Sequence, residues 1–247
     1  MCSVTWTHPR PGELVLCFNR DEKHTRPAGL TPCVWDAGDF LAPRDASGGG
    51  TWLAVRRDGA VMALLNHYPA GFTPAMSSPS RGLLIPALSA SDEKITSALL
   101  SQHISAGMNP FRLLCLMPQE QSAVVFTWDG TSLIRRRLAP RTTGMLTSSS
   151  WNTAAVVASR HAVFRRWRKK HAQPTLAELD AFHRDTRHAR GPSWAVCMSR
   201  DDARTVSLDT LHLHDGRAVM AHNLRPHGMT GFAHETHRAE MRLTLTS

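Results

Sequence analysis

Apolar and β-branched residues occur in short runs that alternate with turn residues along most of the chain. The first two runs, over 4–7 and 13–19, are separated by Pro9-Arg10-Pro11-Gly12, which combines two fixed φ angles with a glycine. This pattern predicts a β-hairpin at the start of the chain. Similar runs bounded by turn residues predict further strands over 51–55, 61–65, 111–117, 122–128, 132–138, 144–149, 193–198, 205–214 and 218–223.

Leucine and isoleucine at helical spacing predict two helices in the middle of the chain, over 80–89 and 91–101, with Ser91 as the N-cap of the second. A long helix is predicted over 155–171 and a shorter one over 175–186. The predicted strands form two groups with helices between them. This arrangement indicates stacked sheets covered by helices.

Composition is that of a globular protein, with 42% hydrophobic and 20% charged residues among 247. We expect one domain over residues 1–247. No apolar run is long enough to cross a bilayer, and the N-terminus lacks the basic-then-apolar order of a secretory signal, so we expect a cytoplasmic protein without membrane insertion. The five cysteines are scattered without a Cys-x-x-Cys pair, which predicts reduced thiols rather than disulfides or a zinc ribbon.

The formal charge of +9 raises the question of nucleic-acid binding, and the densest basic segment is 160–171. Its apolar residues suit the buried stripe of one helix, which leaves most of its cations solvated. We therefore interpret it as a solvated helix face, with nucleic-acid association as the weaker alternative. The 14 histidines include His212 and His214, which share a strand face, but no acidic or cysteine ligand accompanies them at a recognised spacing. We expect neither a metal nor a cofactor.

Cys2 is the residue with the most specific candidate chemistry. It directly follows the initiator methionine, and removal of Met1 would leave a cysteine thiol beside its own α-amine. Such an amine titrates near ~7.7–8.0, so much of it is neutral at cellular pH and able to accept the thiol proton. Taken alone, Cys2 is more simply explained as a small apolar residue that opens a first strand.

The surrounding motifs change that interpretation. The chain carries a series of short motifs: Asn19-Arg20-Asp21-Glu22, Arg26-Pro27-Ala28, Arg44-Asp45, Gly49-Gly50-Thr51-Trp52-Leu53, Leu65-Asn66, Ser80-Arg81-Gly82-Leu83-Leu84 and residues 196–203. With these motifs and its Met-Cys start, the chain resembles the NRDE family, which includes the transport and Golgi organisation protein 2 homologues and begins with Met-Cys. The resemblance covers almost the whole length.

The resemblance implies an α+β fold, the four-layer αββα sandwich of the N-terminal nucleophile hydrolases, in which two antiparallel sheets lie between helices. It also implies kinship with cysteine amidases that cleave linear, non-peptide amides. Four positions match the catalytic residues of those relatives: Cys2 as nucleophile, Arg20 and Asp21 beside it, and Asn66 at the oxyanion. We expect Arg20 to lower the thiol pKa, Asp21 to hold the α-amine, and Asn66 to donate hydrogen bonds to the developing oxyanion.

One departure concerns the oxyanion site. Where the amidases carry a second asparagine after a strand, this chain has Thr147-Ser148-Ser149-Ser150. A hydroxyl donates only one hydrogen bond, so Ser148 and Ser149 would build a weaker or different site. The serine run fits equally well as a helix N-cap and turn.

Three further residues are candidates for substrate binding: Asn19, Arg160 and Arg200. The two arginines would contact a substrate carboxylate or the thiolate, and the alternative for both is an ordinary surface cation. The leading hypothesis is acyl transfer through Cys2 on a small amide or thioester, with water as the second acceptor. The competing hypothesis is a non-catalytic carrier or chaperone of haem, acyl-CoA or another lipid-like ligand, as the family's eukaryotic branch suggests. The same fold is compatible with both.

Overall fold

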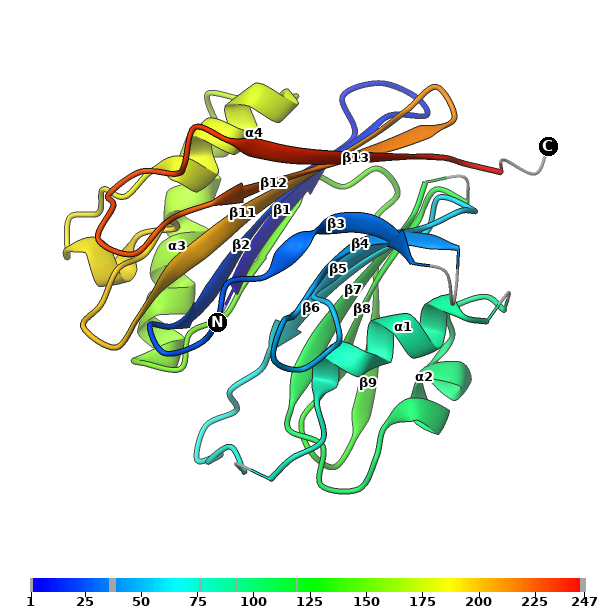
Figure 1. The fold of residues 1–247 in the computed structure, drawn as a ribbon, viewed down its shortest axis with the longest axis horizontal. Helices are drawn as coiled ribbons and strands as arrows, with labels where there is room; N and C mark the ends of the chain where they lie inside the picture. The colour runs from blue at the N-terminus through cyan, green and yellow to red at the C-terminus, as the bar shows by residue number, and fades with distance from the viewer. Residues whose placement is uncertain (1, 36–38, 76, 92, 119, 245–247) are drawn as a thin grey trace.

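Two antiparallel β-sheets lie face to face between helices in the computed structural model, which describes residues 2–35, 39–75, 77–91, 93–118 and 120–244 (Figure 1). Helices α3 and α4 cover the outer face of one sheet, and α1 and α2 cover the outer face of the other. This confirms the α+β, four-layer architecture expected from the sequence.

The first sheet has the strand order β10-β1-β2-β11-β12-β13, and the second runs from β3 to β9 in chain order. The strands of the first sheet are β10 (Gly144–Thr147), β1 (Cys2–Thr7), β2 (Leu14–Lys23), β11 (Ala203–His214), β12 (Arg217–Leu224) and β13 (Thr236–Arg242). Those of the second are β3 (Leu30–Trp35), β4 (Phe40–Arg44), β5 (Leu53–Arg56), β6 (Val61–Asn66), β7 (Phe111–Met117), β8 (Ser122–Trp128) and β9 (Leu133–Leu138). The helices are α1 (Leu84–Ser89), α2 (Ser97–His103), α3 (Thr153–Arg168) and α4 (Leu176–Arg184), with short 3-10 turns η1 (Arg81–Leu83) and η2 (Pro192–Trp194).

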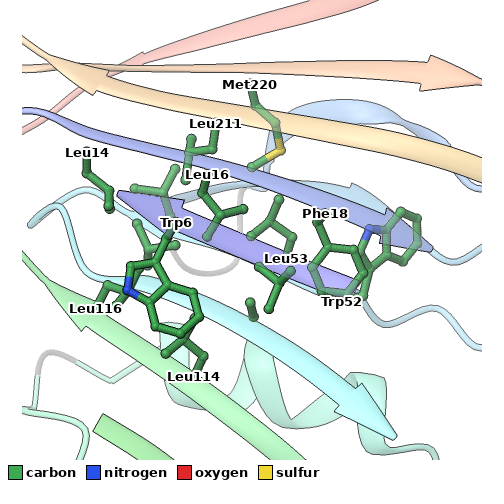
Figure 2. Packing of buried hydrophobic residues seen from close by; sticks show 14 of the residues in the cluster. Trp6, Leu14, Leu16, Phe18, Trp52, Leu53, Leu114, Leu116, Leu211 and Met220 are labelled. Atoms are coloured by element: carbon green, nitrogen blue, oxygen red, sulfur yellow. The ribbon is translucent and has the colours of Figure 1, made fainter. Parts of the chain in front are cut away.

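The main core fills the space between the sheets (Figure 2). Alternation along β1 directs Cys2, Val4 and Trp6 into this core and the intervening residues Ser3 and Thr5 toward the helices. Burying each large apolar side chain contributes about 1.5–3 kcal/mol. The core therefore fixes the register of β1, since a shift by one residue would exchange its apolar and hydroxyl faces.

That register determines what lies near the start of the chain. Cys2 is opposite Arg20 in β2, and Ser3 is opposite Thr147 in β10. The beginning of β1 thus lies between the end of β2 and the end of β10. The NRDE motif forms the last part of β2 itself, because the strand continues to Lys23.

Several sequence-based predictions of local structure are wrong. The segment 193–198 is not a strand; it contains the 3-10 turn η2 followed by bends. Ser91 does not cap α2; the helix starts later, and Thr96 is its N-cap, accepting a hydrogen bond from the Leu99 backbone N–H. Strands β3, β4 and β13 were not predicted, and β13 turns part of the polar tail into an edge strand of the first sheet.

Among the described residues, no helix is long and apolar enough to span a membrane.

Candidate functional site

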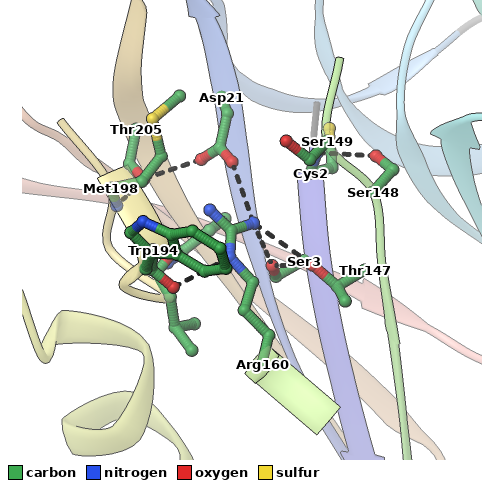
Figure 3. A network of polar contacts seen from close by, with 12 residues as sticks. Cys2, Ser3, Asp21, Thr147, Ser148, Ser149, Arg160, Trp194, Met198 and Thr205 are labelled. Carbon is green, nitrogen blue, oxygen red and sulfur yellow. Dashed lines mark hydrogen bonds and ion pairs between the residues drawn. The ribbon is translucent and has the colours of Figure 1, made fainter. Parts of the chain in front are cut away.

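Cys2 lies at the edge of the core with 7% of its surface exposed. Its backbone nitrogen donates a hydrogen bond to Ser148 Oγ at 3.0 Å, and its carbonyl oxygen accepts one from the Ser148 backbone N–H at 2.9 Å (Figure 3). Ser148 follows β10 directly, so the β1–β10 pairing positions both bonds. The hydroxyl of Ser148 therefore contacts the nitrogen that removal of Met1 would convert into the α-amine.

Burial raises the pKa of the Cys2 thiol to about 11. The positive charge of the N-terminus and a hydrogen bond from the Asp21 backbone oppose this rise, while the carboxylates of Asp21 and Glu22 add to it. The thiol is consequently protonated at neutral pH, and a nucleophilic thiolate requires a base that accepts its proton.

Arg20 faces the same side of the first sheet as Cys2, but its guanidinium is engaged elsewhere. It lies over the Trp52 ring, 4.2 Å from the ring centroid, and Nη2 is 3.5 Å from Glu22 Oε1 and 3.4 Å from Asp45 Oδ2. Its charge is thus shared with two carboxylates, and the side chain links β2 to the second sheet. The expectation that Arg20 lowers the Cys2 pKa below its usual value is wrong for this structure.

Asp21 points to the opposite face of the sheet, where it meets Arg160 from α3 (Figure 3). Asp21 Oδ1 accepts a hydrogen bond from Thr205 Oγ1 at 2.6 Å, and Oδ2 lies 3.7 Å from Arg160 Nη1. The same Arg160 nitrogen donates to Ser3 Oγ at 3.3 Å and to Thr147 Oγ1 at 3.2 Å. Arg160 is 2% exposed, so it is not a surface cation. It joins β1, β2 and β10 directly behind Cys2.

Asp21 and Arg160 carry opposite charges, and each charge offsets part of the cost of burying the other. Burial raises the pKa of Asp21, and the positive charges of Arg160 and of the N-terminus act to lower it. Burial lowers the pKa of Arg160, and the negative charge of Asp21 acts to raise it. Each group therefore depends on the other to remain charged inside the protein.

We expect Arg160→Met to lower the free energy of unfolding by about 3–5 kcal/mol, the usual cost of leaving one partner of a buried ion pair alone. The control is Arg166→Met, which removes an exposed arginine from the same helix and should change stability by no more than about 0.5 kcal/mol. Urea denaturation measures both. Equal unfolding midpoints for the two variants would show that the Asp21–Arg160 pair contributes nothing to stability.

A cavity of about 450 Å³ opens beside Asp21 and is lined mainly by charged and polar side chains. Asn66, the last residue of β6, lines it together with Tyr68, and Asn66 Nδ2 donates to the Tyr68 hydroxyl at 3.1 Å. Arg200 lines it as well, with a guanidinium held by two 2.9 Å hydrogen bonds to Asp202. The structure therefore brings three predicted site residues, Asp21, Asn66 and Arg200, into one cavity.

A second cavity of about 550 Å³ adjoins the first, and the two share Tyr68 and Ser150 in their walls. Ser148 lines the second cavity. Because the Ser148 hydroxyl accepts from the Cys2 nitrogen, the start of β1 lies beside the boundary between the polar first cavity and the more apolar second one.

Two predicted substrate-binding residues have other partners. Asn19 is completely buried on the helix-facing side of β2, where Nδ2 donates to the backbone carbonyls of His183 at 2.8 Å and Val196 at 3.1 Å. Ser149 Oγ donates to the Trp151 carbonyl at 2.5 Å and accepts from its N–H at 3.2 Å. Asn19 therefore anchors α4 to the sheet, and Ser149 forms the turn that was the alternative to an oxyanion role.

Two further residues bear on the site and were not predicted from the sequence. Arg81 is largely buried, its Nη1 donates to the Pro110 carbonyl at 2.9 Å, and the negative forms of Tyr68 and Cys2 both act to raise its pKa against the effect of burial. Arg81 is thus a cation whose charge interacts with the negative form of Cys2. It belongs to the 80–84 stretch that carried the family resemblance, and Tyr68, two residues after Asn66, is the chain's only tyrosine.

Comparison with known proteins agrees with this architecture. The sequence profile of the family described as Transport and Golgi organisation 2 matches residues 1–201. No curated protein gives a significant match to the chain. Among solved structures, the Caenorhabditis elegans N-acylethanolamine-hydrolyzing acid amidase ortholog has a TM-score of 0.51 at 10% identity, over 85% of this chain and 92% of that one. A C2A mutant of conjugated bile acid hydrolase from Clostridium perfringens gives a TM-score of 0.43 at 11% identity, over 98% and 92%. The N-terminal nucleophile hydrolase fold expected from the sequence is thereby confirmed.

Proposed function

The chain belongs to the Transport and Golgi organisation 2 family, and we propose that it is an N-terminal cysteine hydrolase that cleaves a small non-peptide amide or thioester through Cys2. The observation that carries the proposal is the hydrogen bond from the Cys2 nitrogen to Ser148 Oγ. It fixes the nitrogen that becomes the α-amine against Ser148, a residue in the wall of the second cavity, and both cavities are large enough for a small substrate.

The reaction begins when the neutral α-amine of Cys2 accepts the thiol proton and the thiolate attacks the substrate carbonyl carbon. A C–S bond forms and the carbonyl oxygen becomes an oxyanion. On collapse, the bond to the leaving amine or thiol breaks and the α-ammonium returns its proton to that group. Water then attacks the acyl-enzyme thioester, which releases a carboxylic acid and restores the thiol.

Asn66 is the oxyanion donor in this mechanism. Its amide nitrogen carries two hydrogens, of which one is donated to the Tyr68 hydroxyl, so the second remains for the substrate. The Tyr68 contact also fixes the orientation of the amide, which favours a preorganised donor. Arg81 supplies the positive charge beside the thiolate that the sequence had assigned to Arg20.

Asp21 positions the α-amine. The positive charge of the chain's N-terminus lowers the Asp21 pKa. After removal of Met1 the charge would move to the Cys2 nitrogen, and by reciprocity the Asp21 carboxylate would favour the ammonium that forms when this amine accepts the thiol proton. Arg160 holds this carboxylate from the other side and hydrogen-bonds Ser3, the neighbour of Cys2. Arg160 is therefore a positioning residue and not the substrate ligand considered from the sequence.

The proposal requires that Met1 is removed. We expect the intact mass of the protein purified from its own host to lack one methionine, because the mechanism needs a free amine on Cys2. Cys2→Lys is a matched variant, since a large residue at the second position blocks removal of the initiator methionine. A wild-type protein that keeps Met1 quantitatively would end the self-activating mechanism.

A carrier of haem, acyl-CoA or another lipid-like ligand is the second candidate function. The high pKa of the Cys2 thiol and the serines in place of a second asparagine favour it. The test is binding of each ligand to wild type and to Cys2→Ala. Tight binding that Cys2→Ala does not change, without a covalent adduct from any reactive acyl compound, would favour the carrier over the enzyme.

A further inference from the structure

Arg112 is the cation that lines the second cavity. It is near the start of β7, paired with Leu65 and Thr127 on the neighbouring strands. Alternation along β7 directs Leu114 and Leu116 into the core between the sheets, and Arg112 shares their face. The guanidinium therefore occupies the end of the inter-sheet space, where the core gives way to the cavity.

The described residues supply Arg112 with neither a hydrogen-bond acceptor nor a carboxylate partner, and none of those that line the cavity is acidic. Burial lowers the Arg112 pKa, and the charge of Arg136 lowers it further. Arg112 is partly buried. Even partial removal of a cation from water without a partner is unfavourable, and an anionic ligand would offset that cost.

The histidines near Arg112 stay uncharged. Burial lowers the pKa of His67 to about 4, with the charge of Arg112 as the next cause, and burial likewise lowers the pKa of His161. Among the described residues that line this cavity, Arg112 is thus the one positive charge, with Arg136 outside the wall, and this suits a singly charged planar carboxylate better than a doubly charged phosphate. The walls between Arg112 and Ser148 are largely apolar and include Pro69, Phe72, Pro74, Ala154 and Val157.

We propose that the second cavity binds an acyl chain that ends in a carboxylate, with Arg112 as the residue that recognises this end. The inference rests on the proposed function, whose substrate class it narrows to amides or thioesters of dicarboxylic acids. The apolar wall fits the methylene chain between the scissile carbonyl and the distal carboxylate. The first cavity, lined by charged residues, remains hydrated and receives the leaving group and later the water.

Binding to the inactive Cys2→Ala protein tests this without requiring turnover. The probes are adipic acid monobutylamide, hexanoic acid butylamide, and N-butanoyl-6-aminohexanoic acid, which carries its carboxylate on the amine side. We expect the first to bind roughly tenfold more tightly than the second by calorimetry at pH 7, a difference of about 1.4 kcal/mol. In the double variant Cys2→Ala/Arg112→Gln, the preference for the charged probe over the neutral one should disappear. In Cys2→Ala/Arg166→Gln, which changes an exposed position of α3, the preference should remain.

Other outcomes overturn the inference. These are equal affinity for the charged and neutral probes, no binding of any probe, a preference that survives Arg112→Gln, or a preference for the carboxylate on the amine side only. A second measurement does not depend on a variant at position 112: the preference should weaken at high ionic strength, since a charge contact is screened by salt. Acyl adducts on wild-type Cys2 test the hydrolase proposal separately, because they form with neutral acyl groups as well.

Discussion

Cys2→Ala lowers turnover of an amide or thioester substrate by roughly 10⁴–10⁶-fold, as expected when a covalent nucleophile is removed. The loss appears in kcat, because the substitution removes the atom that forms the acyl-enzyme and leaves the walls of both cavities in place. The measurement is steady-state hydrolysis, with thermal unfolding as a check that the variant is folded.

Cys197→Ala is the matched control for that variant. Cys197 is also buried, and burial raises its thiol pKa to about 11, as it does for Cys2. Neither cysteine is among the described residues that line the two cavities, but the Cys2 nitrogen bonds Ser148 in the wall of the second cavity, whereas Cys197 lies in the segment that follows η2. Removal of its sulfur should leave turnover unchanged. If both variants lose activity equally, the loss reflects packing, and Cys2 is not the nucleophile.

Asn66→Ala lowers kcat by about 10²–10³-fold with little change in KM, because the donor acts on the oxyanion and not on the ground-state carbonyl. We expect Asn66→Asp to lower kcat at least as much as Asn66→Ala does, since aspartate keeps the shape of the side chain and replaces the donor with a negative charge. Gln102→Ala, which removes an exposed amide from α2, is the control.

The outcome that would contradict this role is a rise in KM with unchanged kcat for Asn66→Ala. That result would make Asn66 a ligand of the substrate ground state. Tyr68→Phe adds a second check, because loss of the hydroxyl that accepts from Asn66 Nδ2 should slow turnover less than loss of the donor itself.

The sequence predicted the fold well where local patterns agree with burial. The hairpin of β1 and β2 and the strands β7 and β8 follow from apolar runs bounded by turns, and helix α4 lies within the predicted range 175–186, where the structure adds a capping box at Thr175 and Glu178. The failures are of another kind. The segment 193–198 is apolar because it is buried under α3, and it has no strand partner there; β3 and β13 lie at sheet edges, where exposure dilutes the alternating pattern.

The site was harder to predict because adjacent residues of a strand face opposite sides of the sheet. The motif places Arg20 next to Asp21, and both were expected beside the thiol. The register directs Arg20 toward Trp52 and Asp21 toward Arg160, which gives the two residues different partners. No sequence pattern states which of the two faces meets a cavity.

The burial of Arg160 also could not be predicted from the sequence. It lies four residues from both Val156 and Phe164, on the buried stripe of α3, yet an arginine in a basic segment is normally solvated. Its burial depends on Asp21, a residue far away in the sequence that only the fold brings close. The same reason explains why Arg81 was not recognised from the sequence, because only the fold brings its charge close enough to interact with Cys2.

The most direct test of the hydrolase proposal is the mass of the N-terminal peptide after the protein from its own host has been exposed to acyl amides, thioesters and activated esters. We predict a peptide that begins at Cys2 and carries an acyl group on this residue, which forms within the reaction time and then decays by hydrolysis. In Asn66→Ala the same adduct should form much more slowly. A peptide that retains Met1 and stays unmodified with every compound in the panel would contradict the assignment of Cys2 as an N-terminal nucleophile.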